Sequence, residues 1–258
     1  MELGFIGTGE ITSSIVTGLS SFGVTAHSIW LSPRNSAIAN RLANRFQGIS
    51  VASSNQEVLD HSHTILIAVR PPVARDALTD LRFRPDHQVI SLVSALSLRQ
   101  MSKLVAPAVR VTRAVPLPST ARRLSPTAIY PADPVAFELF GAVGTVFPVE
   151  SERKFDAICT ATATIASYFA FTETIASWLE QQGIPAAQGR DYIARLFLGV
   201  TTGALEESGH SFQSLAAIHA TAGGINQQFL HHLVEHGMLT RVSEGLDAVL
   251  HRIGDEES

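Results

Sequence analysis

A glycine-rich turn lies almost at the start of the chain, between a short apolar run and an amphipathic helical pattern. It reads Gly4-Phe5-Ile6-Gly7-Thr8-Gly9-Glu10-Ile11-Thr12. Gly7 permits a tight turn, and Gly9 lets the backbone approach a pyrophosphate, which the free N–H groups and positive dipole end of the following helix stabilise. Thr12 stands where this fingerprint usually has Gly or Ala, so we expect helix and strand to lie slightly further apart. Because it joins a strand to a helix, the turn predicts a dinucleotide-binding strand–helix–strand unit.

Short apolar runs alternate with helical patterns through the first half of the chain. Several of these runs are apolar throughout, as strands covered on both faces are. Helical spacing recurs between the first two runs and again at residues 37–46. This alternation predicts an α/β fold, a parallel doubly wound sheet of the Rossmann type. The predicted strands are residues 3–6, 28–31, 64–69, 89–93 and 109–112.

The pattern changes near residue 150, after which strand-like runs give way to long helical stretches. These stretches are residues 155–182, 186–207, 227–236 and 239–253, and glycines or proline separate them. We therefore predict a nucleotide-binding domain at residues 1–150 and an all-α domain at residues 151–258. The last residues, from 254, are expected to form a solvated tail.

The end of the second predicted strand indicates which nucleotide is bound. A site that prefers NAD places an acidic residue there to bind the ribose 2′-hydroxyl. This chain reads Leu31-Ser32-Pro33-Arg34-Asn35-Ser36, which contains no acid. Arg34 can form two hydrogen bonds with a 2′-phosphate, and Ser32 and Asn35 can donate to it. The segment predicts NADPH (NADP+); the alternative is a surface loop with a solvated arginine.

Composition narrows the possible partners. Hydrophobic residues make up 45% of the chain and charged residues 16%, which suggests apolar surface buried between subunits. A net charge of −4 argues against binding nucleic acid or an anionic membrane. The single cysteine, Cys159, excludes an intramolecular disulfide and is expected to be a small buried hydrophobe. The uncharged stretch at residues 157–172 is shorter than the ~20 residues of a membrane span, so we expect a soluble cytoplasmic protein.

Several segments together resemble the pyrroline-5-carboxylate reductase family. The ordered set spans nearly the whole chain and keeps the family's order of elements, although no single motif is diagnostic. The matching segments are residues 4–19, Ser32-Pro33-Arg34-Asn35, Ile67-Ala68-Val69-Arg70-Pro71, Val89-Ile90-Ser91-Leu92-Val93-Ser94-Ala95, Arg113-Ala114-Val115-Pro116, residues 181–185, Thr221-Ala222-Gly223-Gly224 and residues 235–253.

The resemblance implies hydride transfer from NADPH to the carbon of a cyclic imine, a small-molecule substrate, giving a secondary amine such as proline. It also implies a homodimer with intertwined helical domains, within a larger homo-oligomer in some members. Thr221, Gly223, Gly224 and Asn226 are then expected to shape the substrate site, with Thr221 and Asn226 as the catalytic candidates. The expected cofactor-binding residues are Gly7, Thr8, Gly9, Glu10, Ile11, Ser32, Arg34, Asn35, Ala68, Val69, Arg70, Pro71, Ser94 and Ala95.

Three departures from the family pattern fall on the substrate side. Leu117 replaces an asparagine near the nicotinamide end, residues 162–167 lack the family's glycines and proline, and Asn226 replaces a threonine that meets the imine nitrogen. The alternatives are therefore a reductase of another imine, a reductase of a carbonyl or hydroxyacid substrate on the same scaffold, and a non-catalytic NADP-binding sensor.

Two further features favour structural roles. His232 and His236 have the spacing of a helical metal pair, but no acidic third ligand is in register, so we predict no metal site. Hydroxyacid dehydrogenases of this two-domain plan use a lysine within the helical region as general acid, whereas Lys154 lies just before that region's long helix and lacks their glycine-rich motif. A surface charge is the expected role of Lys154.

Overall fold

The computed structural model describes residues 1–21 and 28–255, and the chain divides into two compact units. The first unit contains Met1–Cys159 together with the end of the chain from Leu250, and the second contains Thr160–Val249. The sequence-based domain boundary at residue 150 stays a prediction.

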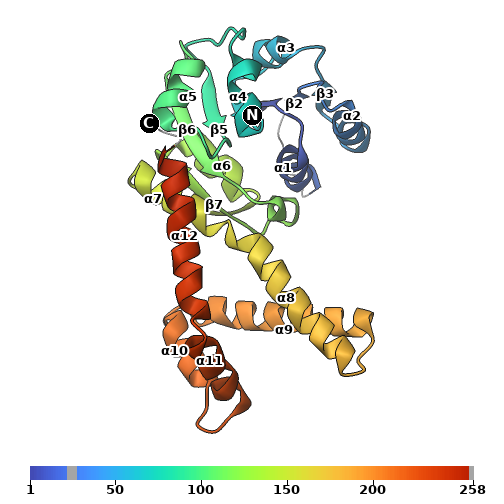
Figure 1. The fold of residues 1–258 in the computed structure, drawn as a ribbon. Helices are drawn as coiled ribbons and strands as arrows, with labels where there is room; N and C mark the ends of the chain where they lie inside the picture. Colours follow the sequence, from blue (N-terminus) through green and yellow to red (C-terminus); the bar gives the residue numbers. More distant parts are fainter. Residues whose placement is uncertain (22–27, 256–258) are drawn as a thin grey trace. The chain divides into compact units, whose positions relative to one another are not determined.

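An eight-stranded sheet forms the first unit, with the strand order β3-β2-β1-β4-β5-β6-β7-β8 (Figure 1). The first six strands are parallel to one another, whereas β7 is antiparallel to β6 and parallel to β8. Their bounds are β1 Glu2–Ile6, β2 Ser28–Leu31, β3 Ile49–Val51, β4 Thr64–Ile67, β5 Gln88–Ser91, β6 Arg110–Val115, β7 Ser125–Tyr130 and β8 Gly144–Pro148.

Helices cover both faces of this sheet, which confirms the doubly wound α/β fold. Leu19 of α1, Leu42 of α2 and Phe140 of α6 pack into one apolar cluster with alternate strand residues. Helices α3, α4 and α5 contribute to the cluster on the opposite face. The bounds are α1 Glu10–Ser21, α2 Ser36–Arg45, α3 Asn55–Asp60, α4 Pro71–Leu78, α5 Leu98–Leu104, the 3-10 helix η1 Pro118–Arg122 and α6 Pro134–Gly141.

Strands β3, β7 and β8 were missed by the sequence reasoning, and the sheet is mixed rather than wholly parallel. β3 has only three residues, and β7 carries polar Ser125 and Thr127, so neither gives an apolar run. Pairing of β7 with β8 depends on Gly144, because a Cβ there would lie 2.0 Å from the carbonyl oxygen of Ser125. Such close backbone contacts cannot be read from hydrophobic periodicity.

Gly18 brings α1 close to η1, the segment that follows β6. A Cβ at Gly18 would lie 2.2 Å from the carbonyl oxygen of Thr120 and 3.0 Å from Cγ1 of Val143. The remaining inward side chains of α1, such as Ile15 and Val16, are fully buried. This contact therefore supports the chain that leaves the end of β6.

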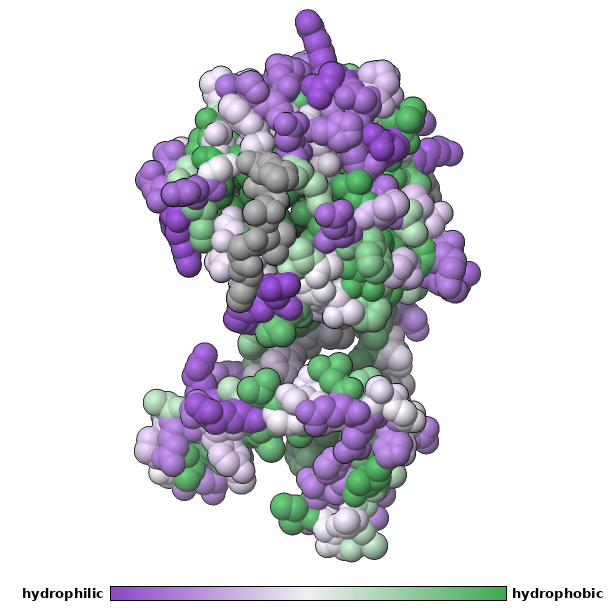
Figure 2. All heavy atoms as spheres, turned by 180° about the vertical axis from the view of Figure 1, so that it is seen from behind, coloured by the Kyte–Doolittle hydropathy of each residue, from purple (hydrophilic) through white to green (hydrophobic). Residues whose placement is uncertain are grey.

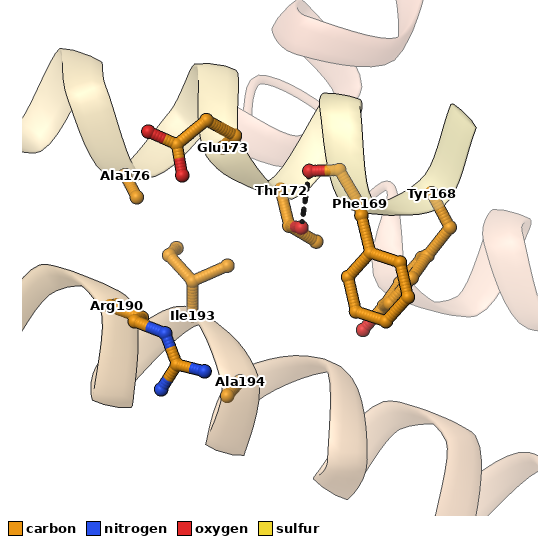
Figure 3. Close-up of a pocket in the computed structure, with 8 residues that line it drawn as sticks. All are labelled: Tyr168, Phe169, Thr172, Glu173, Ala176, Arg190, Ile193 and Ala194. Carbon is orange, nitrogen blue, oxygen red and sulfur yellow. Dashed lines mark hydrogen bonds between the residues drawn. The ribbon is translucent and has the colours of Figure 1, made fainter. Parts of the chain in front are cut away.

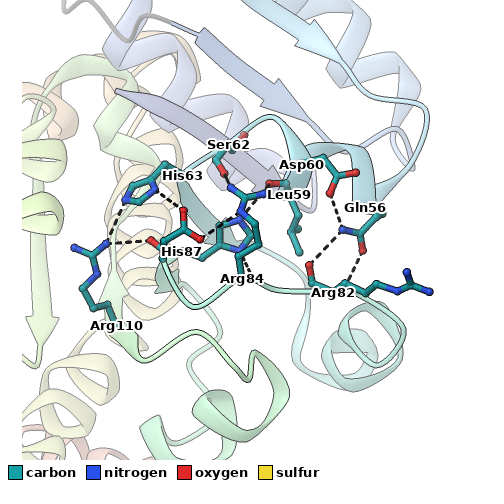
Figure 4. A network of polar contacts seen from close by, with 10 residues as sticks. Gln56, Leu59, Asp60, Ser62, His63, Arg82, Arg84, His87 and Arg110 are labelled. Carbon is teal, nitrogen blue, oxygen red and sulfur yellow. Dashed lines mark hydrogen bonds and ion pairs between the residues drawn. The ribbon is translucent and has the colours of Figure 1, made fainter.

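A polar network lies at the amino-terminal ends of β4, β5 and β6 (Figure 4). Nδ1 of the fully buried His87 accepts a hydrogen bond from the Arg84 backbone N–H at 3.1 Å, so the ring proton is on Nε2, 3.2 Å from the Leu59 carbonyl oxygen. Burial, with the nearby charge of Arg84, lowers the pKa of His87. The network lies at the edge of the sheet opposite the glycine turn, so we read it as structural.

Helices α7 Glu152–Ala161, α8 Thr164–Gln181, α9 Ala186–Glu206, α10 Phe212–His219, α11 Ile225–Glu235 and α12 Met238–Asp255 complete the chain. The predicted helix 155–182 is two helices, because a turn with a hydrogen bond from Ala163 N–H to Thr160 O separates α7 from α8. The sequence reasoning missed α10, whose first turn Ser211 caps. The predicted tail begins later than expected, since α12 reaches Asp255; residues 256–258 lie outside the described residues.

The helical unit exposes much apolar surface. Helices α8, α10 and α11 have no buried residue, and α8 packs on α9 through ring contacts of Phe197 with Tyr168 and Phe171. Figure 2 shows apolar side chains at the surface beside polar ones. Within the described residues, no helix has the length and apolar character needed to cross a membrane.

Candidate functional site

The glycine turn lies at the carboxyl end of β1 and fits the predicted geometry. Gly7 has a φ of +103°, and a Cβ there would lie 2.5 Å from the carbonyl oxygen of Ala68. Both the backbone conformation and the close approach therefore require glycine. Gly9 has no atom within 4 Å of the position a Cβ would take, which leaves its side of the turn open. Residues Glu10 and Ile11 begin α1 directly after the turn.

Ser32 holds this turn from the end of β2. Its Oγ accepts a hydrogen bond from the Gly7 N–H at 2.8 Å, and the Thr8 hydroxyl donates to the Ser32 carbonyl oxygen at 2.8 Å. Thr12 is fully buried, and its hydroxyl donates to the Gly7 carbonyl oxygen at 2.7 Å. The structure thus gives Ser32 and Thr12 roles in fixing the turn that the motif alone did not indicate. The wider spacing of helix and strand expected from Thr12 stays a prediction.

A cavity of about 300 Å³ lies beside the turn. It brings together four predicted residues, Gly7, Ser32, Arg34 and Val69, and four that sequence reasoning missed, Asn55, Val73, Asp76 and Ala77. Asn55 begins α3 directly after β3, so the signal for it was its place after a strand that went unrecognised. Val73, Asp76 and Ala77 follow one face of α4, at helical spacing.

Charge in the cavity comes from two elements. Arg34 is an exposed side chain just after β2, and Asp76 is an exposed carboxylate on α4. No ion pair joins Arg34 to Asp76 in the described part of the chain. Asn35 lies outside the cavity lining; its Oδ1 accepts from the Ile38 N–H at 3.4 Å at the start of α2.

The remaining predicted cofactor residues follow β4 and β5. Ala68 and Val69 lie against Gly7, Arg70 precedes α4, and Pro71 is the first residue of that helix. Ser94 and Ala95 form a turn after β5, closed by a hydrogen bond from Leu96 N–H to Val93 O at 3.4 Å. Every predicted cofactor residue therefore belongs to the carboxyl-terminal edge of the parallel strands, to the turns that follow it or to the first residues of the helices after those turns.

Arg113 joins the turn after β5 to α7, and sequence reasoning gave it no role. Its side chain is 1% exposed, with Nη1 2.6 Å from Glu152 Oε1 and 3.0 Å from Asp156 Oδ1. Nη2 donates to the Ser94 carbonyl oxygen at 2.8 Å, and the guanidinium lies 4.5 Å from the centre of the Phe155 ring. Burial raises the pKa of Asp156, and the Arg113 charge opposes that rise.

The predicted substrate residues lie in the second unit, in the loop between α10 and α11 and in the first turn of α11. Gly223 has a φ of +72°, and its N–H donates to Gln227 Oε1 at 2.9 Å. Nδ2 of Asn226 donates to the His219 carbonyl oxygen at 3.3 Å. A Cβ at Gly224 would lie 2.6 Å from the Thr221 hydroxyl oxygen. Thr221, Gly223 and Asn226 are exposed, and the amides of Asn226 and Gln227 hold the loop in shape.

Two other departures have local structural partners. The Leu117 N–H donates to Ser125 Oγ at 2.9 Å just before η1, and Thr162 and Ala163 form the break between α7 and α8. Within the described residues, no group of three or more His, Cys, Asp or Glu side chains is arranged to hold a metal ion. The rings of His232 and His236 lie with their centres 4.2 Å apart and their planes tilted by 38°. Lys154 pairs with Glu150 at the surface.

Helices α8 and α9 also enclose a cavity of about 200 Å³ (Figure 3). Glu173 on α8 and Arg190 on α9 line it, with Tyr168, Phe169 and Ile193 as its apolar wall. A larger groove of about 690 Å³ runs along the end of α9 and α10, where Leu205 and Phe212 are exposed.

The doubly wound sheet and its glycine turn place the chain in a class of proteins with a Rossmann-type nucleotide-binding unit followed by a helical unit. Residues 2–95 match the family model described as NADP oxidoreductase coenzyme F420-dependent. Residues 152–255 match the model described as pyrroline-5-carboxylate reductase dimerisation. The two matches follow one another along most of the chain.

Known proteins resemble the chain over its full length. Pyrroline-5-carboxylate reductase of Escherichia coli (strain K12) is 24% identical, over 95% of this chain and 94% of that protein. The Vibrio alginolyticus reductase is 23% identical, over 99% and 97%. A crystal structure of the Streptococcus pyogenes enzyme has a TM-score of 0.85 at 23% identity, covering 98% of each chain. The Plasmodium falciparum enzyme with NADP bound has a TM-score of 0.84 at 16% identity, covering 100% of this chain and 98% of that one. The dimerisation model over residues 152–255 and the full-length relatives confirm the resemblance to the pyrroline-5-carboxylate reductase family seen in the sequence.

Proposed function

We propose that this protein is an NADPH-dependent reductase of a cyclic imine, acting as in the reduction of 1-pyrroline-5-carboxylate to proline. The observation that carries the proposal is the cavity in which the Gly7 turn, Ser32 and Arg34 meet, on a chain that resembles this family. The residues fit the cofactor, because Gly7 leaves no side chain in the turn, Gly9 is open, and Arg34 supplies a cation for a 2′-phosphate.

NADPH, when bound, supplies the hydride. The chain's part is to hold the dinucleotide at the carboxyl-terminal edge of the sheet through Gly7–Ile11, Arg34 and the turns at 68–71 and 94–95, with Ser32 fixing the first turn. When the nitrogen of an imine is protonated, its carbon accepts hydride directly, so the reaction does not require a strong acid or base in the protein. Positioning and charge complementarity are then the main demands on the fold.

Thr221, Gly223, Gly224 and Asn226 are proposed to shape the substrate site. The Thr221 hydroxyl is suited to donate to a substrate carboxylate. Nδ2 of Asn226 donates one of its two hydrogens to the His219 carbonyl oxygen, so Asn226 can offer a substrate its second N–H as a donor and its Oδ1 as an acceptor. That acceptor suits the N–H of a protonated imine.

The test is the rate of NADPH oxidation with 1-pyrroline-5-carboxylate, compared with NADH and with a panel of other cyclic imines, ketones and 3-hydroxyacids. Turnover of the pyrroline carboxylate with preference for NADPH supports the proposal. Turnover only of a ketone or hydroxyacid would assign the scaffold to carbonyl chemistry, and tight NADPH binding without any turnover would make the protein a sensor. If the native protein does not turn over the pyrroline carboxylate, an Asn226→Thr variant tests the reason. Activity gained only in that variant would show that Asn226 excludes the substrate.

We also propose that the protein forms a homodimer through the helical unit, as a dimer or within a larger homo-oligomer. Its support is the dimerisation family of residues 152–255 and the exposed apolar residues of that unit. Leu198 on α9 is 67% exposed and Leu124 in the first unit is 68% exposed, so a substitution at Leu124 is a suitable control for the same substitution at Leu198. We expect light scattering to give a dimer or larger species that Leu198→Asp dissociates and Leu124→Asp leaves intact. A native monomer would contradict the proposal.

The roles divide, in this proposal, between a nucleotide-binding domain at residues 1–150 and a dimerisation and substrate domain at residues 151–258. A cytoplasmic location fits an enzyme that draws on the NADPH of the cell interior, and fractionation of cells that express the protein tests it.

A further inference from the structure

The buried guanidinium of Arg113 contacts the backbone of the turn after β5. Nη2 donates to the Ser94 carbonyl oxygen at 2.8 Å. The rest of the guanidinium is fixed, because Nη1 lies between Glu152 and Asp156 and the group lies over the Phe155 ring. Glu152 Oε1 also accepts a hydrogen bond from the N–H of Leu98, the first residue of α5, so the same carboxylate also holds the helix that follows the turn.

This contact determines how one peptide plane is oriented. In a planar trans peptide, the C=O and the N–H of the next residue point in opposite directions. Because the Ser94 C=O points inward to Arg113, the N–H of Ala95 points away from the buried cluster. That N–H has no acceptor among the residues that the structure describes. It lies just beyond the carboxyl end of β5, the edge at which dinucleotides bind in such sheets.

We propose that Arg113 is a positioning residue, which holds the Ser94–Ala95 peptide so that the Ala95 N–H donates to an acceptor oxygen of the nicotinamide half of the cofactor. The inference rests on the proposed NADPH site. The nicotinamide half is the part concerned because the adenosine half is expected at the Arg34 cavity beside β1 and β2, whereas β5 lies beyond β4 in the sheet.

The experiment compares the binding of NADPH with that of adenosine 2′,5′-bisphosphate, which carries only the adenosine half. Arg113→Lys keeps a charge for Glu152 and Asp156 but loses the planar fork that also reaches Ser94. Arg110→Lys is the matched control, since Arg110 lies on the same strand at the opposite end, where it donates to the Asp86 carbonyl oxygen. Loss of one neutral hydrogen bond predicts about three- to tenfold weaker NADPH binding in Arg113→Lys. Binding of the bisphosphate is expected to be unchanged, and Arg110→Lys to match the native protein.

Equal weakening of both ligands would overturn the inference, because Arg113 would then only support the unit as a whole; unchanged NADPH binding would also overturn it. If the native protein binds neither ligand, the proposed cofactor itself is wrong. Hydrogen exchange at the Ala95 amide tests the native protein in case Arg113→Lys does not fold. NADPH is expected to slow that exchange and the bisphosphate is not, and NADPH binding without protection of Ala95 would refute the proposal.

Discussion

Replacing Gly18 with alanine places a methyl group against the backbone of η1. The new Cβ would lie 2.2 Å from the carbonyl oxygen of Thr120, and ordinary contact begins near 3.4 Å. The contact must therefore lengthen by about 1.2 Å, and a backbone atom cannot turn aside as the end of a side chain can. Either α1 or η1 has to move, although Ile15, Val16 and Leu19 anchor α1 in the core.

Overpacking of a well-packed interior costs about 1–3 kcal/mol, and a backbone clash belongs at the upper end of that range. Alanine recovers about 1 kcal/mol through its higher helix propensity. The net expectation is a loss of about 2 kcal/mol, which lowers the melting temperature by about 4–8 °C for a chain of this size.

Thermal and urea unfolding of Gly18→Ala and Gly141→Ala, at one protein concentration, measures the effect. Gly141 ends α6 in the same unit, and a Cβ there would meet Val146 Cγ2 at an ordinary 4.0 Å. Alanine at position 141 is therefore expected to be neutral or to stabilise by up to about 1 kcal/mol. If Gly18→Ala is as stable as Gly141→Ala, α1 and η1 do not approach one another as the structure has them, and the reasoning fails.

Three further predictions concern single side chains. The pKa of His87 is lowered in the folded protein, so its contribution to stability is present above the unfolded value of 6.5 and is lost as the pH falls through the folded pKa. In urea unfolding below pH 6.5, the His87→Gln variant should therefore lose less stability than the native protein. Equal losses in the two proteins would contradict this prediction. Arg34→Ala should weaken NADPH binding about 10- to 100-fold without changing NADH binding, whereas Asp76→Asn should not weaken NADPH binding. Calorimetry with both nucleotides measures these affinities. Loss of NADH affinity in Asp76→Asn would make Asp76 the ribose-binding acid. Burial raises the pKa of Cys159 to about 12, so alkylation at pH 8 should be slow until the protein unfolds; labelling of the native protein at the rate of a free thiol would show that Cys159 is not buried.

Sequence reasoning succeeded where the cause of a structure is local. β1 and β4 are buried along nearly their whole length, and such strands give continuous apolar runs. It failed where the stabilising contacts are distant in sequence. β7 was missed because it is held by pairing with β6 and β8, and α10 because an eight-residue helix with no buried residue has little periodic signal.

The candidate site divides in the same way. The positive φ of Gly7 and the absence of an acid in the segment after β2 are properties of a short stretch, and the sequence by itself determined them. Asn55 and Asp76 are remote from that stretch along the chain and join it only because parallel strands bring their following turns to one edge. The tertiary structure likewise decided the hydrogen bond from Arg113 to the Ser94 carbonyl oxygen and the hydrogen bond from the Gly7 N–H to Ser32 Oγ. A hydrogen bond depends on the distance and direction of two groups, and when their residues are far apart along the chain only the folded backbone sets that geometry.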